Sequence, residues 1–138
     1  GVRMRLDSVI RFPRQMLLGA VQDEQLIYDM GVEIAKQCSL TGVHVNFAPV
    51  VDLNVNPNNP VINSRSFGEE KVHVTKLSHA YMKGMQDNTI LACAKHFPGH
   101  GDTDVDSHLG LPVINHNRER LMDIELYPFK SLIDSGMA

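Results

Sequence analysis

The chain has 138 residues, of which 43% are hydrophobic and 21% are charged, and its formal net charge is -3. This length supports one domain at most and is short for a complete α/β barrel. The negative charge gives no electrostatic case for binding nucleic acid or an anionic membrane, and no apolar segment approaches the roughly 20 residues of a membrane-spanning helix.

Both ends of the chain are those expected of a segment cut from a longer protein. Position 1 is Gly1 rather than an initiator methionine, no signal-peptide pattern follows it, and the chain stops just after Gly136.

The first predicted helix begins near Asp23 and ends before Gly42, a residue type typical of helix C-termini. Its apolar residues recur with the 3.6-residue period of an amphipathic helix: Leu26, Ile27, Met30, Ile34 and Cys38. Residues 43–48 then alternate in character and predict a strand. On this strand we expect His44 to be a packed or hydrogen-bonded core residue rather than a ligand.

The segment 49–68 is rich in Asn and Pro, which predicts a long irregular loop carrying Arg65 near its end. A second helix is predicted over residues 69–88. Its apolar face consists of Val74, Leu77, Tyr81 and Met85. The apolar run 90–94 is short and does not alternate, which indicates a strand buried on both faces.

Asn117 is expected to cap a third helical region, which Pro128 divides into two pieces. Gly136 closes the second piece, and residues 137–138 would begin another strand. The order strand, long loop, helix implies parallel strands with right-handed crossovers. The predicted fold is therefore α/β, with about three βα units of a partial TIM-type (β/α)8 barrel. Three units cannot close such a barrel, so residues 1–138 would be one incomplete fragment; a small open α/β sheet is the alternative.

The segment 95–108, K-H-F-P-G-H-G-D-T-D-V-D-S-H, concentrates the titratable groups of the chain. It holds one lysine, three histidines and three aspartates, which is the material for proton transfer or for a metal site. The loops that follow parallel strands lie at one edge of the sheet. We therefore expect Arg65 and this segment to converge.

Three interpretations of the segment follow from its residues. His96, His100 and an aspartate could bind a divalent metal, although the proline and glycines between them oppose the helix that this spacing suits. Asp106 and His108 could form a carboxylate–imidazole pair in which the aspartate orients the ring. The polar side chains could also serve only to bond the backbone of a glycine-rich loop. The residues alone favour the pair and leave the other two open.

The motifs K-H-F-P-G-H-G at 95–101 and D-S-H at 106–108 resemble the signature of the family 3 glycoside hydrolases, and more narrowly their β-N-acetylglucosaminidase branch. The sequence S-R-S-F-G at 64–68 is similar to the arginine motif of the family. G-V-R-M-R at 1–5 resembles the tail of its D-x-E-x-G-x-x-x-R element. The resemblance covers essentially the whole chain.

The resemblance implies roles for particular residues. His108 would be the acid/base catalyst with Asp106 as its partner, in a retaining mechanism that passes through a covalent glycosyl-enzyme. The sugar hydroxyls at the non-reducing end would be held by Arg5, Arg65, Lys95 and His96. No metal or other cofactor is implied. The glycines at 99, 101 and 110 would give the loop freedom to close.

The parent protein would hydrolyse terminal β-N-acetylglucosaminides of an oligosaccharide or muropeptide, as in bacterial peptidoglycan recycling, in the cytoplasm or the periplasm. A β-glucosidase-like relative and a catalytically silent sugar-binding module are the alternatives. The nucleophilic aspartate of the family would lie beyond Ala138, so we expect the 138 residues alone to be inactive. Their open sheet edges would favour contact with the remainder of the barrel or self-association.

Overall fold

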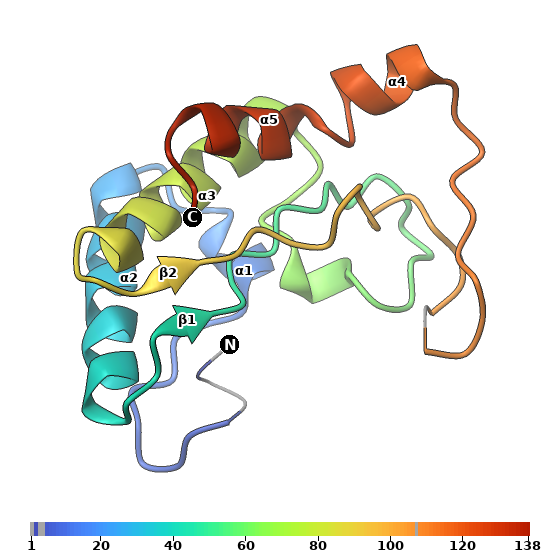
Figure 1. Cartoon of the computed structure of the whole chain (residues 1–138). Helices are drawn as coiled ribbons and strands as arrows, with labels where there is room; N and C mark the ends of the chain where they lie inside the picture. The colour runs from blue at the N-terminus through green and yellow to red at the C-terminus, as the bar shows by residue number, and fades with distance from the viewer. Residues whose placement is uncertain (1, 3–4, 107) are drawn as a thin grey trace.

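The computed structural model describes residues 2, 5–106 and 108–138, and it has an α/β arrangement (Figure 1). Its elements in chain order are α1 (Gln15–Leu18), α2 (Glu24–Leu40), β1 (Val45–Asn46), the 3-10 helix η2 (Asn63–Arg65), α3 (Lys71–Gln86), β2 (Leu91–Ala92), α4 (Arg118–Asp123) and α5 (Tyr127–Asp134). Figure 1 shows the two strands side by side, with α2 and α3 lying along one side of them. No helix in the described part of the chain combines the length and the hydrophobicity that crossing a membrane requires.

The predicted helices are confirmed, and side chains cap the N-termini of α2, α3 and α4. The Asp23 carboxylate accepts a hydrogen bond from the Gln25 N–H at 2.9 Å, and the Asn117 side chain accepts one from the Arg120 N–H at 2.9 Å. Gly42 and Gly136 have the positive φ angles, 72° and 85°, that follow a helix C-terminus.

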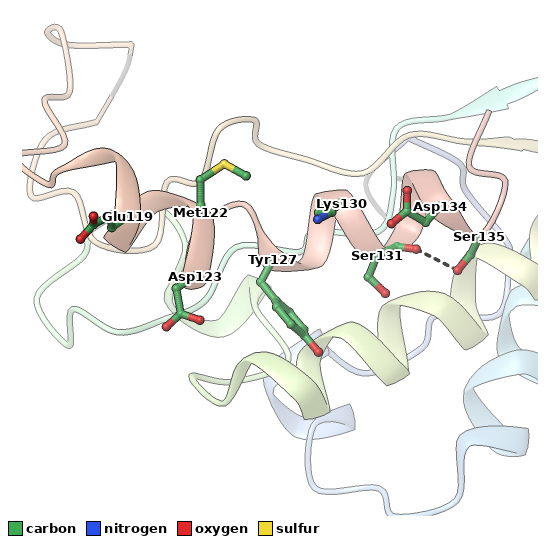
Figure 2. Close-up of a pocket in the computed structure, with 8 residues that line it drawn as sticks. All are labelled: Glu119, Met122, Asp123, Tyr127, Lys130, Ser131, Asp134 and Ser135. Carbon is green, nitrogen blue, oxygen red and sulfur yellow. Dashed lines mark hydrogen bonds between the residues drawn. The ribbon is translucent and has the colours of Figure 1, made fainter.

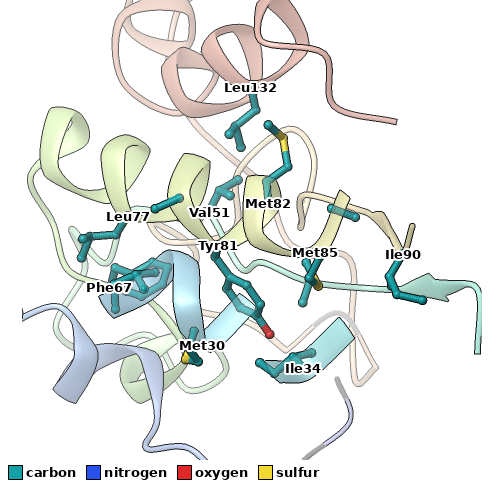
Figure 3. Close-up of a cluster of buried hydrophobic side chains, with 14 of the residues drawn as sticks. Met30, Ile34, Val51, Phe67, Leu77, Tyr81, Met82, Met85, Ile90 and Leu132 are labelled. Atoms are coloured by element: carbon teal, nitrogen blue, oxygen red, sulfur yellow. The ribbon is translucent and has the colours of Figure 1, made fainter. Parts of the chain in front are cut away.

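The core lies between α2, α3 and the two strands, and α5 packs against α3 from another side (Figure 3). The predicted apolar faces of α2 and α3 are buried, except that Leu26 is exposed because it lies off the face of α2 that meets α3. Gly31 and Gly84 face each other where these helices cross. A Cβ on Gly84 would lie 2.2 Å from the Tyr28 carbonyl oxygen, so the contact between the helices requires glycine.

The strands β1 and β2 are parallel, as predicted, with Val45 opposite Leu91 and Asn46 opposite Ala92. A further parallel bridge joins Val50 and Lys95. The strands are shorter than predicted, because the backbone hydrogen bonds become irregular around Pro49, which has no N–H to donate.

The predicted third strand is not formed. Residues 137–138 belong to no strand, and the Ala138 N–H donates instead to the Gln86 side chain at 3.0 Å. The structure therefore supports an α/β fold with two parallel strands, and it contains no third βα unit within the described residues.

The two faces of the small sheet differ in burial. Asn46 and Ala92 face the helices and are buried, whereas Val45, Phe47 and Leu91 are exposed on the other face. The prediction that residues 90–94 are buried on both faces is wrong for this chain, because Leu91 is 49% exposed. The core position expected for His44 is also wrong, since its side chain is exposed.

Candidate functional site

Two loops that follow neighbouring strands meet at one edge of the sheet, as predicted. Arg65 ends η2, in the loop after β1, and His96 lies just beyond β2. Their side chains are in contact, with Arg65 Nη2 3.0 Å from His96 Nε2. The peptide bond between Lys95 and His96 is cis.

Lys95 lies beside this contact and is half-buried. Burial lowers the pKa of Lys95 below its ordinary value, and the positive charge of Arg65 lowers it further. Lysine and arginine donate hydrogen bonds and accept none, so the pair offers donors to oxygen atoms of a ligand.

Asp52 holds this edge together, and the sequence analysis did not identify it. Its carboxylate, with a side chain that is 0% exposed, accepts hydrogen bonds from the backbone N–H groups of His96 at 3.1 Å and His100 at 2.7 Å. It also bonds His96 Nδ1 at 2.7 Å. The available signal was its position, directly after an apolar run that follows β1.

Asn59 is a second residue that the sequence analysis missed. Its Nδ2 donates to the carbonyl oxygens of His100 at 2.7 Å and Thr103 at 2.9 Å, while its Oδ1 accepts from the N–H groups of Val61 and Ile62. The asparagine-rich loop after β1 therefore braces the histidine-rich loop after β2. Composition gave no reason to choose this asparagine among its neighbours.

His100 is buried and serves the structure of the loop. Its Nδ1 lies 2.5 Å from Thr103 Oγ1. Burial lowers the pKa of His100, and this outweighs the opposing effect of the Asp52 charge. Because Asp52 and Arg65 engage both ring nitrogens of His96, the geometry does not offer the two-histidine metal site considered from the sequence.

Asp106 and His108 form the predicted pair. His108 Nδ1 lies 2.9 Å from Asp106 Oδ1, which also accepts from the His108 backbone N–H at 2.9 Å. These two hydrogen bonds lower the pKa of Asp106. The His108 side chain is 86% exposed, and no hydrogen bond joins the pair to Arg65, Lys95 or the ring of His96 among the described residues.

Arg5, like the Asp106–His108 pair, has no side-chain hydrogen bond to Arg65, Lys95 or His96 among the described residues. It is exposed, and its backbone N–H donates to the Val2 carbonyl at 3.0 Å. The neighbouring motif positions 1, 3 and 4 lie outside the described residues.

A polar cluster that was not predicted links Asp102, in the segment 95–108, to His116 and Arg120 further along the chain. His116 Nε2 bonds Asp102 at 2.5 Å, and Arg120 Nη2 lies 3.2 Å from buried Glu125 and 3.8 Å from Asp102. The ligand atoms of the two carboxylates and His116 lie within 4.8 Å of one another, as in a metal site. The Arg120 guanidinium already supplies the positive charge that a metal ion would bring to the two carboxylates. We therefore infer that the cluster is a clamp, which restrains the loop between Asp102 and His116.

Two glycines of the loop lie in close contact with other segments. A Cβ on Gly101 would lie 1.6 Å from the Leu53 carbonyl oxygen, and one on Gly99 would lie 2.8 Å from Glu125 Cβ. Both positions therefore exclude a side chain, and the freedom of the loop to close stays a prediction. At Gly110 a Cβ would meet, among the described residues, only Val105 Cγ1 at 3.2 Å.

An open groove runs along α4 and α5, away from these residues (Figure 2). It is lined by Glu119, Met122, Asp123, Tyr127, Lys130, Ser131, Asp134 and Ser135. Lys71 pairs with Asp123 beside it at 2.5 Å, and the Ser135 hydroxyl donates to the Ser131 carbonyl at 2.8 Å. The groove contains none of the predicted site residues.

Residues 1–138 match the family model described as "Glycosyl hydrolase family 3 N terminal domain". The chain therefore belongs to glycoside hydrolase family 3, and the resemblance seen in its motifs is confirmed.

Within this family, the chain is similar to proteins described as β-hexosaminidase and β-N-acetylglucosaminidase. It is 46% identical to β-hexosaminidase A of Pseudoalteromonas piscicida, over 97% of this chain and 23% of that protein. A β-N-acetylglucosaminidase structure from Paenibacillus sp. shares 44% identity with a TM-score of 0.93, covering 96% of this chain and 26% of that one. The structure of NagZ from Neisseria gonorrhoeae shares 34% identity with a TM-score of 0.89, and the match covers 96% of this chain and 40% of that one. The chain thus spans between 23% and 40% of the length of these relatives.

Proposed function

We propose that the protein containing this chain is a retaining β-N-acetylglucosaminidase that removes terminal non-reducing N-acetylglucosamine from an oligosaccharide or muropeptide. The observation that carries the proposal is the Asp106–His108 pair, on the loop that begins with Lys95 and His96 at the sheet edge. Membership of family 3 and the β-N-acetylglucosaminidase relatives support it.

The geometry of the pair suits acid/base catalysis. Asp106 bonds Nδ1 of His108, which directs Nε2 of the ring toward solvent as the reacting nitrogen. In the first step, Nε2 gives its proton to the glycosidic oxygen as the bond to the anomeric carbon breaks and a carboxylate nucleophile bonds that carbon. In the second step, Nε2 takes a proton from the water that displaces the carboxylate. No aspartate of this chain is assigned as the nucleophile.

Three further side chains would hold the sugar. Arg65, Lys95 and His96 lie together at the sheet edge, where the donors of the two cations suit hydroxyl oxygens. Arg5 would join them from the N-terminal segment when substrate is bound.

We also propose that residues 1–138 are part of a (β/α)8 barrel. The exposed face of the sheet, which carries Val45, Phe47 and Leu91, would then point toward the barrel interior. A structure of the full-length protein tests this arrangement, and solvent on that face would contradict it.

The catalytic assignment is tested by leaving-group dependence in the full-length protein. We expect His108→Ala to lower kcat/KM by about 10²- to 10⁴-fold on an oligosaccharide, and by much less on 4-nitrophenyl N-acetylglucosaminide, whose leaving group needs little protonation. The exposed His44 provides a matched control as His44→Ala. Equal losses on both substrates would show that His108 is not the acid.

Two further measurements separate the alternatives. Faster hydrolysis of the β-glucoside than of the β-N-acetylglucosaminide would favour a β-glucosidase-like enzyme, and sugar binding without turnover of either would favour a silent binding module. We expect no turnover by residues 1–138 alone; hydrolysis that His108→Ala abolishes would overturn that expectation.

A further inference from the structure

Asp52 is a buried carboxylate that contacts residues of the candidate site. Its side chain has no exposed surface, so it cannot touch a ligand. Among the residues that the structure describes, every hydrogen bond to this carboxylate comes from His96 or His100. These donors lie 44 and 48 residues away in the sequence, so Asp52 links the loop after β1 to the loop after β2.

The contacts of the His96 ring define where its proton lies. An ionised carboxylate only accepts, so the 2.7 Å contact with Asp52 places a hydrogen on Nδ1. The guanidinium of Arg65 only donates, so the 3.0 Å contact at the other side of the ring requires a lone pair on Nε2. One tautomer, with the hydrogen on Nδ1, satisfies both contacts.

This tautomer lets His96 hold Arg65 in place. Nε2 has one lone pair, and the 3.0 Å contact with Arg65 Nη2 uses it. The guanidinium carries further N–H groups, which can donate to the oxygens of sugar hydroxyls beside Lys95. The tautomer of His96 therefore decides whether these donors are held at the sheet edge.

We propose that Asp52 is a positioning residue that fixes the Nδ1–H tautomer of His96, and that it thereby sets the affinity of the site for the hydroxyls of the terminal sugar. The part that concerns affinity rests on the proposed function. The part that concerns the tautomer stands on the contacts alone.

Asp52→Asn is the informative substitution, because it keeps the shape of the side chain. Its oxygen can still accept from the backbone N–H groups, but its amide nitrogen presents a donor to His96 Nδ1. The ring must then carry its hydrogen on Nε2, which faces the donor of Arg65. We expect KM for 4-nitrophenyl N-acetylglucosaminide to rise about 10- to 100-fold, with a smaller change in kcat, because Arg65, which loses its contact with His96, serves bound substrate and transition state alike.

The tautomer can be read directly by ¹⁵N NMR of the histidine side chains in the full-length protein. The His96 signal is assigned as the one that His96→Gln removes. We expect Nδ1–H in the wild type and Nε2–H in Asp52→Asn. Asp87→Asn is the matched control, because this carboxylate lies at the surface against Lys83, and it should change neither KM nor the His96 signal.

Three results would overturn the proposal. The first is an Nε2–H tautomer in the wild type, which is decisive even where Asp52→Asn does not fold. The second is an unchanged KM in Asp52→Asn. The third is independence of the two residues: if Asp52 acts through His96, adding Asp52→Asn to His96→Gln has little further effect on KM, whereas multiplied effects would refute the link.

Failure of the proposed function looks different. It would appear as a wild-type protein that neither hydrolyses the aryl N-acetylglucosaminide nor binds N-acetylglucosamine in calorimetry. The two tautomers measured by NMR would then still support or refute the role of Asp52 in fixing His96.

Discussion

Gly101 is where the segment 95–108 packs against the loop after β1, and replacing it with alanine should lower both stability and activity. The added Cβ would lie 1.6 Å from the carbonyl oxygen and 2.5 Å from the carbonyl carbon of Leu53. Both are backbone atoms of a buried residue, so no side chain can turn aside. A tolerable contact of at least 3.0 Å requires the two loops to separate by about 1.4 Å.

Such a separation affects stability and catalysis together. Overpacking in a well-packed region costs about 1 to 3 kcal/mol, and backbone against backbone places Gly101→Ala at the upper end. The hydrogen bonds of Asn59 to this loop would also lengthen. Because a displacement of about 1 Å can cost 10²-fold in rate, we expect kcat/KM of the full-length protein to fall by about 10²-fold or more.

Gly110→Ala provides the control within the same loop. Its Cβ would meet only a movable methyl group of Val105 at 3.2 Å, so kcat/KM should stay within about threefold of wild type. Thermal unfolding and hydrolysis of 4-nitrophenyl N-acetylglucosaminide measure both variants. Wild-type activity in Gly101→Ala would refute the argument from close approach. A loss in Gly110→Ala as large as that in Gly101→Ala would show that glycine freedom, not packing, matters.

Three other predictions concern titration and the loop. Because burial depresses the pKa of His100, its contribution to stability is complete above pH 6.5, its ordinary pKa, and declines as the pH falls below it. His100→Asn should therefore flatten the decline in Tm between pH 7 and 5, and an unchanged slope would contradict this. Because the charge of Arg65 is one cause of the depressed pKa of Lys95, Arg65→Gln should move the alkaline rise of KM to higher pH, and an unmoved or lowered rise would contradict this. His116→Ala removes the bond that closes the loop, so limited proteolysis within residues 103–113 should accelerate about fivefold; an unchanged rate would show that the clamp does not restrain the loop.

The sequence predicted the elements whose causes are local. The helices α2 and α3 follow from apolar periodicity and from capping residues such as Asp23, because these act within a few residues of chain. The contact of Arg65 with His96 followed from a rule of topology, that loops after parallel strands share an edge.

The missed features depend on contacts between distant segments. Asp52 and Asn59 bond to partners more than 40 residues away. The position of Asp52 after an apolar run was the one local signal, and nothing in the neighbourhood of Asn59 distinguishes it from a surface residue. The close approach at Gly101 was not predicted for the same reason, since the atom that excludes a side chain there belongs to Leu53. The exposure of Leu91 depends on what covers the sheet, which its own apolar segment does not specify.

The bare sheet face around Val45 and Leu91 also matters for biosynthesis. In the proposed barrel, a nascent polypeptide would present unpaired strand edges and exposed apolar side chains until later strands cover them. Refolding yield should therefore fall steeply as protein concentration rises, and a chaperone that shields apolar surface should restore it.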